Sequence, residues 1–210
     1  MRRILAEVAF LAAAAAAPAA GGTFPWGGGG PTREPNPATV ALRDYTATIR
    51  TNLGEITLDL QPDAAPNAVR MFLKLAARGA YGGARFQCVF KDRMLVVGTP
   101  FAKGKEDEGE TIPYEESPLP ATSGAVMMDK TPDGQNCPGR LLIALGDQSY
   151  MDRSYTVFAE ISKGLDVAKR IGGVAVRPND GSPAPIEDVV IEQVVVTKKS
   201  PPKPKEGEKK

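Results

Sequence analysis

Residues 45–79, YTATIRTNLGEITLDLQPDAAPNAVRMFLKLAARG, decide the fold class of this chain. The first half predicts two strands, at 45–51 and 55–60, because apolar and polar residues alternate on both sides of a short Asn-Leu-Gly loop. The second half predicts a helix over 63–79, since apolar residues recur at helical spacing and Gly79 suits the position just past a helix end. The domain is therefore expected to open with a β-hairpin followed by a helix.

The sequence after this helix is mostly β in character. It predicts one short helix at 163–171 and six further strands, at 86–90, 94–97, 125–128, 140–145, 155–161 and 189–197. Eight strands and two helices predict a mainly β fold, a closed eight-stranded antiparallel barrel capped by the two helices, because closure of the sheet removes exposed strand edges.

The N-terminal region has the pattern of a targeting segment. Residues 1–19 carry a basic start, an apolar run and the sequence Ala17-Pro18-Ala19, which together are typical of a secretory signal peptide. This pattern predicts export to the periplasm or the extracellular space, and an Ala-rich arm on a cytoplasmic protein is the alternative. The apolar run is too short to span a bilayer comfortably, so we expect no stable membrane insertion once it is removed.

Two segments of biased composition flank the predicted domain. Residues 20–44 are rich in Gly and Pro and predict a flexible leader, in which Phe24 and Trp26 are either a docking motif or loosely packed aromatics. Residues 198–210 are rich in Lys, Pro and Glu and predict a disordered tail. Residues 45–197 remain as one domain, long enough to bury a single core.

Composition excludes several classes of function. The 210 residues carry a net charge of +1, so no overall field attracts nucleic acid, and we expect no nucleic-acid partner. The sequence has no histidine, which excludes Ser-His-Asp and Cys-His catalysis in their usual forms. Its two cysteines are too few for a structural zinc site, and we expect neither a metal nor a cofactor.

Three stretches in this order resemble one known family. ATIRTNLGEITLDLQPDAAPNAVRMFLKLAARGAY is similar to the opening hairpin and first helix of cyclophilin-type peptidyl-prolyl isomerases. IPYEESPLPATSGAVMM resembles the segment that leads into that family's G-x-L-S-M-A strand. YMDRSYTVFAEISKGLDVAKRI resembles its W-L-D-x-x-x-T-V-F-G-x-V-x-x-G-M-D-V motif. The resemblance covers about residues 45–197 and implies the same barrel, a monomer, and clients that are proline-containing peptides or proteins.

Prolyl isomerisation needs neither a nucleophile nor a metal. Amide resonance opposes rotation of the X-Pro bond with a barrier of roughly 20 kcal/mol. Rotation leaves a free lone pair on the proline nitrogen, and a donor aimed at it within an apolar pocket stabilises the twisted state more than the planar one. The expected site is therefore an apolar pocket with one well-placed donor, preferably a guanidinium.

The resemblance assigns this pocket to named residues. The family's F-H-R-V, which carries its catalytic arginine, aligns with Phe86-Gln87-Cys88-Val89, so the arginine position falls on Cys88. Other positions of the family's pocket fall on Arg93, Met94, Val96, Leu142, Met151 and Tyr155. The implied activity is peptidyl-prolyl isomerisation that assists protein folding, reduced because a thiol is a weak donor.

Arg140 is the candidate replacement for the missing guanidinium. It aligns with a glutamine that borders the family's arginine, and it shares a strand face with Leu142 because side chains alternate along a strand. We expect its guanidinium to lie above Leu142 and Met94 and to be free of surface carboxylates.

Other interpretations of these residues remain open. Cys88 is equally well explained as a small core residue, and Arg140 and Arg93 as solvated charges. The alternative functions are an inactive proline-peptide binding module, an exported folding factor, or an unrelated small barrel. Since the resemblance brings Cys137 near Cys88 in a chain that looks exported, a disulfide between them is possible, and two free thiols are the alternative.

Overall fold

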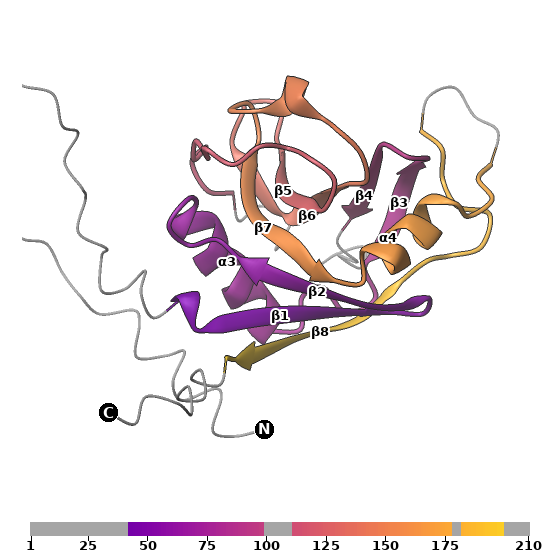
Figure 1. The fold of residues 1–210 in the computed structure, drawn as a ribbon, viewed down its shortest axis with the longest axis horizontal. Coiled ribbons are helices and arrows are strands. Elements are labelled where there is room, and N and C mark those ends of the chain that lie inside the picture. The colour runs from indigo at the N-terminus through magenta and orange to yellow at the C-terminus, as the bar shows by residue number, and fades with distance from the viewer. Residues whose placement is uncertain (1–41, 99–110, 178–181, 200–210) are drawn as a thin grey trace, which may run out of the picture.

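The computed structural model describes residues 42–98, 111–177 and 182–199, and its elements are drawn in Figure 1. The two helices are α3 (Pro66–Ala77) and α4 (Leu165–Gly172), and η3 (Ser149–Met151) is a short 3-10 turn. The strands are β1 (Tyr45–Thr51), β2 (Gly54–Leu60), β3 (Arg85–Phe90), β4 (Met94–Gly98), β5 (Ala125–Lys130), β6 (Asn136–Ala144), β7 (Thr156–Lys163) and β8 (Ile191–Lys198).

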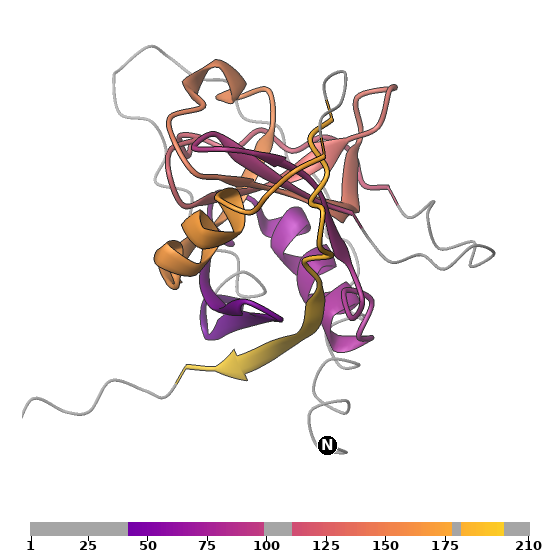
Figure 2. The same cartoon turned by 90° about the vertical axis from the view of Figure 1, so that its right-hand side faces the viewer.

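The eight strands form one antiparallel sheet in the order β3-β4-β6-β5-β7-β2-β1-β8. A short seam joins β3 to the segment that precedes β8, because Arg85 pairs with Val190 and the Phe86 N–H donates to the Val189 carbonyl at 3.0 Å. Figure 2 shows the chain before β8 running beside β3. The predicted eight-stranded antiparallel barrel is confirmed, with closure through a few backbone bonds.

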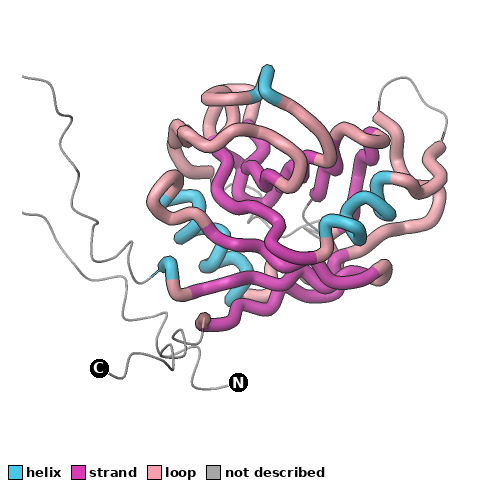
Figure 3. Tube along the Cα trace, viewed as in Figure 1, coloured by secondary structure: helices cyan, strands magenta, loops and turns pink. Residues whose placement is uncertain are grey.

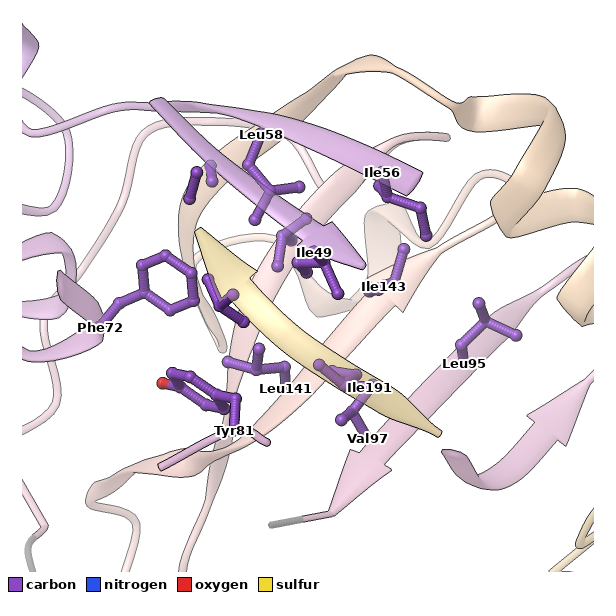
Figure 4. Packing of buried hydrophobic residues seen from close by; sticks show 14 of the residues in the cluster. Ile49, Ile56, Leu58, Phe72, Tyr81, Leu95, Val97, Leu141, Ile143 and Ile191 are labelled. Carbon is purple, nitrogen blue, oxygen red and sulfur yellow. The ribbon is translucent and has the colours of Figure 1, made fainter. Parts of the chain in front are cut away.

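The inner core fills the barrel and includes the buried face of α3. Phe72 from this helix packs against Tyr81 and Phe158, with ring centroids 5.3 and 5.2 Å away. The Tyr81 hydroxyl is fully buried and donates to the Pro138 carbonyl at 2.8 Å. Figure 4 shows the Phe72 and Tyr81 rings next to each other, with Leu141 beside Tyr81. Burial of so many large side chains is the main stabilising contribution to the fold.

The N-terminus of α3 receives its cap from a distant segment. Ala65 occupies the N-cap position without a side-chain hydrogen bond, and the first turn contains no acidic residue. The Glu115 carboxylate instead accepts from the backbone N–H groups of Asn67 and Ala68, the latter at 2.9 Å. This contact ties the chain that precedes β5 to the helix.

The structure differs from the sequence-based expectations at a few boundaries. Strand β6 begins at Asn136 rather than at 140, and the η3 turn was not expected (Figure 3). Leu42 is 4% exposed and packs in the inner core, so the domain extends a little further than the predicted start at 45. The predicted signal peptide, and the leader as far as residue 41, lie outside the described residues. In the described ranges no helix is long and apolar enough to cross a membrane.

Candidate functional site

The same strands that line the inner core carry a second apolar cluster on their outer face. In β6, Leu141 and Ile143 point into the inner core, whereas Leu142 and Ala144 belong to the second cluster, as strand alternation requires. We call this second set the outer cluster. Its buried members are Ala121, Ala125, Met127, Leu142, Ala144, Met151 and Val157, and its half-buried members are Met94, Val96, Leu119 and Tyr155.

Strand register aligns the floor of the outer cluster in one row. Cys88 pairs with Val96, Val96 with Leu142, and Leu142 with Met127. Side chains at paired positions project to the same face of a sheet, so Cys88 lies at one end of this apolar row. Five residues predicted for the pocket are thus brought together in the outer cluster: Met94, Val96, Leu142, Met151 and Tyr155.

Cys88, which the resemblance places at the family's arginine position, cannot supply a strong donor. Its side chain is half-buried beside Val96, and both Cys88 and Cys137 are free thiols in the structure. A thiol donates only weakly, so this end of the row is close to apolar in character. The possible disulfide is not formed, and the alternative of two free thiols describes the structure.

Arg140 does not meet the condition expected of a free guanidinium. Its Nε is 3.0 Å from an Asp129 carboxylate oxygen, and its Nη2 donates to the Lys130 carbonyl at 2.8 Å. The expectation of a guanidinium free of ion pairs is therefore wrong. The Nε atom is buried and not aligned for a hydrogen bond, so the attraction between Nε and Asp129 is mainly coulombic.

A bulge explains why Asp129 reaches Arg140. Met128 pairs with Leu141, but the next residue, Asp129, pairs with Cys137, so Pro138, Gly139 and Arg140 bulge out of β6. Bulges redirect side chains, and this one places a carboxylate of β5 beside the guanidinium of β6. Arg140 as the catalytic donor remains a prediction, now with the condition that this ion pair opens.

Lys130 lies between Tyr155 of the outer cluster and a second tyrosine, Tyr114. The Lys130 ammonium lies 4.0 Å from the ring centroid of Tyr114 and 5.6 Å from that of Tyr155. Burial raises the pKa of Tyr155, and the charge of Asp129 adds to this shift. Burial also raises the pKa of Tyr114, so both phenols stay neutral near pH 7, and the Tyr114 hydroxyl donates to the Arg153 carbonyl.

Besides Cys88 and Arg140, three predicted substrate-binding residues are not members of the outer cluster: Phe86, Gln87 and Arg93. Phe86 is 2% exposed and packs in the inner core, on the other side of the sheet from the outer cluster, and its role in substrate binding stays a prediction. Gln87 is the extra residue of a bulge in β3, is exposed, and its side-chain amide lies over Gly98. Arg93 is exposed in the turn that precedes Met94, at the edge of the cluster.

Tyr150 is an exposed aromatic that the sequence-based selection missed. It is 67% exposed in η3, directly before Met151 of the outer cluster. The Asp152 carboxylate holds this turn over the cluster by accepting from the Ala121 N–H at 2.7 Å. The signal was present in the sequence, because Tyr-Met-Asp aligns with the family's Trp-Leu-Asp.

Two hollows of the domain lie away from the outer cluster. Leu53 and Ile186 line the first, of about 350 Å³, and Met71 and Pro113 line the second, of about 420 Å³. Among the residues that the structure describes, no group of three or more acidic or cysteine side chains is arranged to hold a metal ion.

Comparison with known proteins identifies the family. The family model for cyclophilin type peptidyl-prolyl cis-trans isomerase/CLD matches residues 46–196. The chain belongs to the cyclophilin family. A cyclophilin from Rhizopus delemar, peptidyl-prolyl cis-trans isomerase-like 1, is 32% identical over 134 residues, which cover 62% of this chain and 81% of that protein. The human protein of the same name is 28% identical over 147 residues, which cover 68% of this chain and 87% of its own length.

A longer relative and a crystal structure are also similar to this chain. Peptidyl-prolyl cis-trans isomerase-like 2 of Gibberella zeae is 29% identical, but the match spans only 26% of that longer protein. A Cryptosporidium parvum cyclophilin, crystallised in the presence of the dipeptide Ala-Pro, superposes with a TM-score of 0.63 at 24% identity. The match covers 72% of this chain and 98% of that structure, and it shows the cyclophilin fold.

Proposed function

We propose that this cyclophilin binds proline-containing segments on the outer cluster and isomerises their X-Pro bonds at a much reduced rate. The observation that supports the proposal is the row Cys88–Val96–Leu142–Met127, which forms an apolar floor. The resemblance places the family's arginine at the Cys88 end of this row. An apolar floor favours binding of the proline ring, whereas stabilisation of the twisted amide requires a donor.

The size of the expected loss follows from the missing donor. Removal of one preorganised donor from a comparable electrostatic site costs about 2.7–4 kcal/mol, or about 10²–10³ in rate. Arg140 does not compensate while Asp129 and the Lys130 carbonyl hold it. Substrate binding, which depends on the apolar floor, is expected to be retained.

A binding module without turnover is the second candidate function. The Arg140–Asp129 ion pair favours it, because this pair occupies the nearest predicted replacement for the catalytic guanidinium. The two candidates make the same prediction for peptide binding and differ only in measurable turnover.

The test compares Cys88→Arg with Cys88→Met in full-length protein, assayed on a proline tetrapeptide. Cys88→Arg restores a guanidinium at the end of the row, and we expect kcat/KM to rise at least 10-fold. Cys88→Met is the matched control, since it adds length without charge, and it should change kcat/KM little. If tetrapeptide binding is absent in all three proteins, the proposal is wrong. Binding without turnover in the unsubstituted protein supports the second candidate.

We further propose that the protein is exported and acts on clients outside the cytoplasm. The basic and apolar N-terminal pattern followed by Ala17-Pro18-Ala19 supports this localisation. N-terminal sequencing of protein from the medium or periplasm should give a chain that begins near residue 20. An intact Met1 on protein retained in the cytoplasm would contradict export.

A further inference from the structure

We propose that the Phe24-Pro25-Trp26 segment of the leader occupies the outer cluster of its own chain in the absence of a client. This inference rests on the proposed function, because it names an internal ligand for the same site. Of the 19 prolines in the sequence, Pro25 alone has an aromatic residue on both sides. The segment therefore combines an X-Pro bond with two large apolar side chains.

The exposed part of the outer cluster matches this composition. Met94, Val96 and Tyr155 are half-buried and leave apolar surface open beside the buried Leu142. Tyr150 is 67% exposed in η3, directly before Met151 of the outer cluster. Contiguous exposed apolar surface, rather than a single exposed side chain, marks an interaction site. Thioether side chains such as Met94 adapt to ligands of irregular shape, and aromatic rings gain from contact with sulfur.

Charge does not oppose this docking. Residues 20–41 contain one cation, Arg33, and one anion, Glu34, so the leader is neutral overall. The cations beside the site are Arg140, which is paired with Asp129, Lys130, which already contacts two tyrosine rings, and the exposed Arg93. A guanidinium in this position favours a nearby indole face through cation–π attraction.

The tether is long enough to reach the site. Leu42 fixes the start of the domain, because it is 4% exposed in the inner core. Figure 1 shows this start beside α3 and β1, whereas the turn that carries η3 lies at the top of the same view. The chain between Trp26 and Leu42 spans up to about 53 Å, which exceeds the roughly 40 Å diameter expected of a domain of this size.

Tethering makes even a weak ligand competitive. A short Gly-rich linker gives an effective concentration on the order of millimolar. A segment that binds with a dissociation constant of about 1 mM at an effective concentration of about 2 mM lowers the apparent affinity for an added peptide about threefold. The leader would therefore shield the apolar surface and yield to clients that bind more tightly. Removal of a signal peptide after Ala19 leaves this segment in place.

The test uses the full chain and a fluorescently labelled Ala-Ala-Pro-Phe tetrapeptide. The variant Phe24→Ser/Pro25→Ala should bind the tetrapeptide about threefold more tightly than the unsubstituted protein. Pro35→Ala, a proline change in the same leader, is the matched control and should leave the affinity unchanged. Trp26 is the single tryptophan of the chain, so its emission reports docking directly, and Met94→Glu should shift this emission to the red.

Each outcome decides between the hypotheses. Equal affinity of the unsubstituted protein and Phe24→Ser/Pro25→Ala overturns the inference and leaves the proposed function intact. Failure of both proteins to bind the tetrapeptide overturns the proposed function, and the inference with it. A red shift of Trp26 emission on dilution of the unsubstituted protein shows that the leader of a second copy is the occupant, which overturns docking within one chain.

Discussion

At the scale of single residues, the site depends on the sheet face to which each side chain points and on the partner of each charged group. The resemblance predicts that Val96 and Leu142 line one pocket, and the two residues are directly paired across β4 and β6 in the outer cluster. The partner of Arg140 could not be predicted in this way. A bulge of unknown position in β6 decides whether Asp129 lies beside the guanidinium, and the sequence around Pro138 does not define it.

The first residue-scale prediction concerns the Arg140–Asp129 pair. Because the guanidinium is already engaged, Arg140→Ala should change kcat/KM on a proline tetrapeptide less than threefold. Asp129→Asn removes the opposing charge, and we expect it to raise kcat/KM several-fold if Arg140 can serve as the donor. The double variant Asp129→Asn/Arg140→Ala should return to the unsubstituted rate. A gain that persists in the double variant would show that Asp129 acts without Arg140.

The second residue-scale prediction concerns Tyr81 at alkaline pH. Burial raises the pKa of this phenol far above its ordinary value, so the folded state binds the phenolic proton more tightly than the unfolded state. The resulting stabilisation is complete below the unfolded pKa near 10 and is lost progressively as pH rises above it, by about 1.4 kcal/mol per pH unit.

Tyr81→Phe separates this ionisation from the hydrogen bond. At pH 7 the variant should be less stable by about 1 kcal/mol, since the Pro138 carbonyl loses its donor. Above pH 10 the difference in unfolding free energy should shrink and then change sign, because phenylalanine cannot ionise. Urea unfolding at pH 7, 10 and 11 measures both effects, with Tyr150→Phe as the exposed control. A constant difference across this range would contradict the assignment.

At the scale of elements, hydrophobic periodicity predicted most of the secondary structure. The two helices and eight strands lie within a few residues of their expected ranges, because each has one face buried in the core. The early start of β6 and the η3 turn were missed. Neither has a strong periodic pattern, and both are positioned by long-range contacts such as the backbone bonds between Ile112 and Asn136.

The element-scale prediction tests the distant cap of α3. Glu115→Ala removes the carboxylate that accepts from the Asn67 and Ala68 N–H groups, and those donors have no acidic substitute in the first turn. We expect a loss of about 1–2 kcal/mol in the free energy of unfolding and a Tm lower by about 2–8 °C. Glu116→Ala is the neighbouring control, because Glu116 is exposed and its ion pair with Arg153 is long, at 3.8 Å, and expected to contribute little. Equal effects of the two substitutions would show that the cap does not stabilise the helix.

At the scale of the whole molecule, composition located the domain but not its limits. The Gly- and Pro-rich leader was expected to continue to residue 44, yet Leu42 packs in the inner core and Arg43 forms an ion pair with Asp63. At the other end, Lys199 donates through its backbone to the Asp44 carbonyl and through its side chain to Asp59. These contacts involve single residues without periodicity, so no pattern in the sequence marks them.

The whole-molecule prediction follows from these terminal contacts. A chain trimmed to residues 42–199 keeps all of these contacts, and its Tm should lie within about 3 °C of that of the full chain. This margin allows for the loss of about 0.7 kcal/mol of stabilisation by a weakly docked leader. A chain trimmed to 45–197 loses the buried Leu42 side chain, whose burial stabilises the fold by about 1.5–3 kcal/mol. Its Tm should therefore fall by about a further 3–12 °C. Leu42→Ala in the full chain is the control that separates loss of this side chain from loss of the terminus. Thermal unfolding followed by circular dichroism measures all four proteins, and identical Tm values for the two trimmed chains would show that the domain begins at Tyr45 after all.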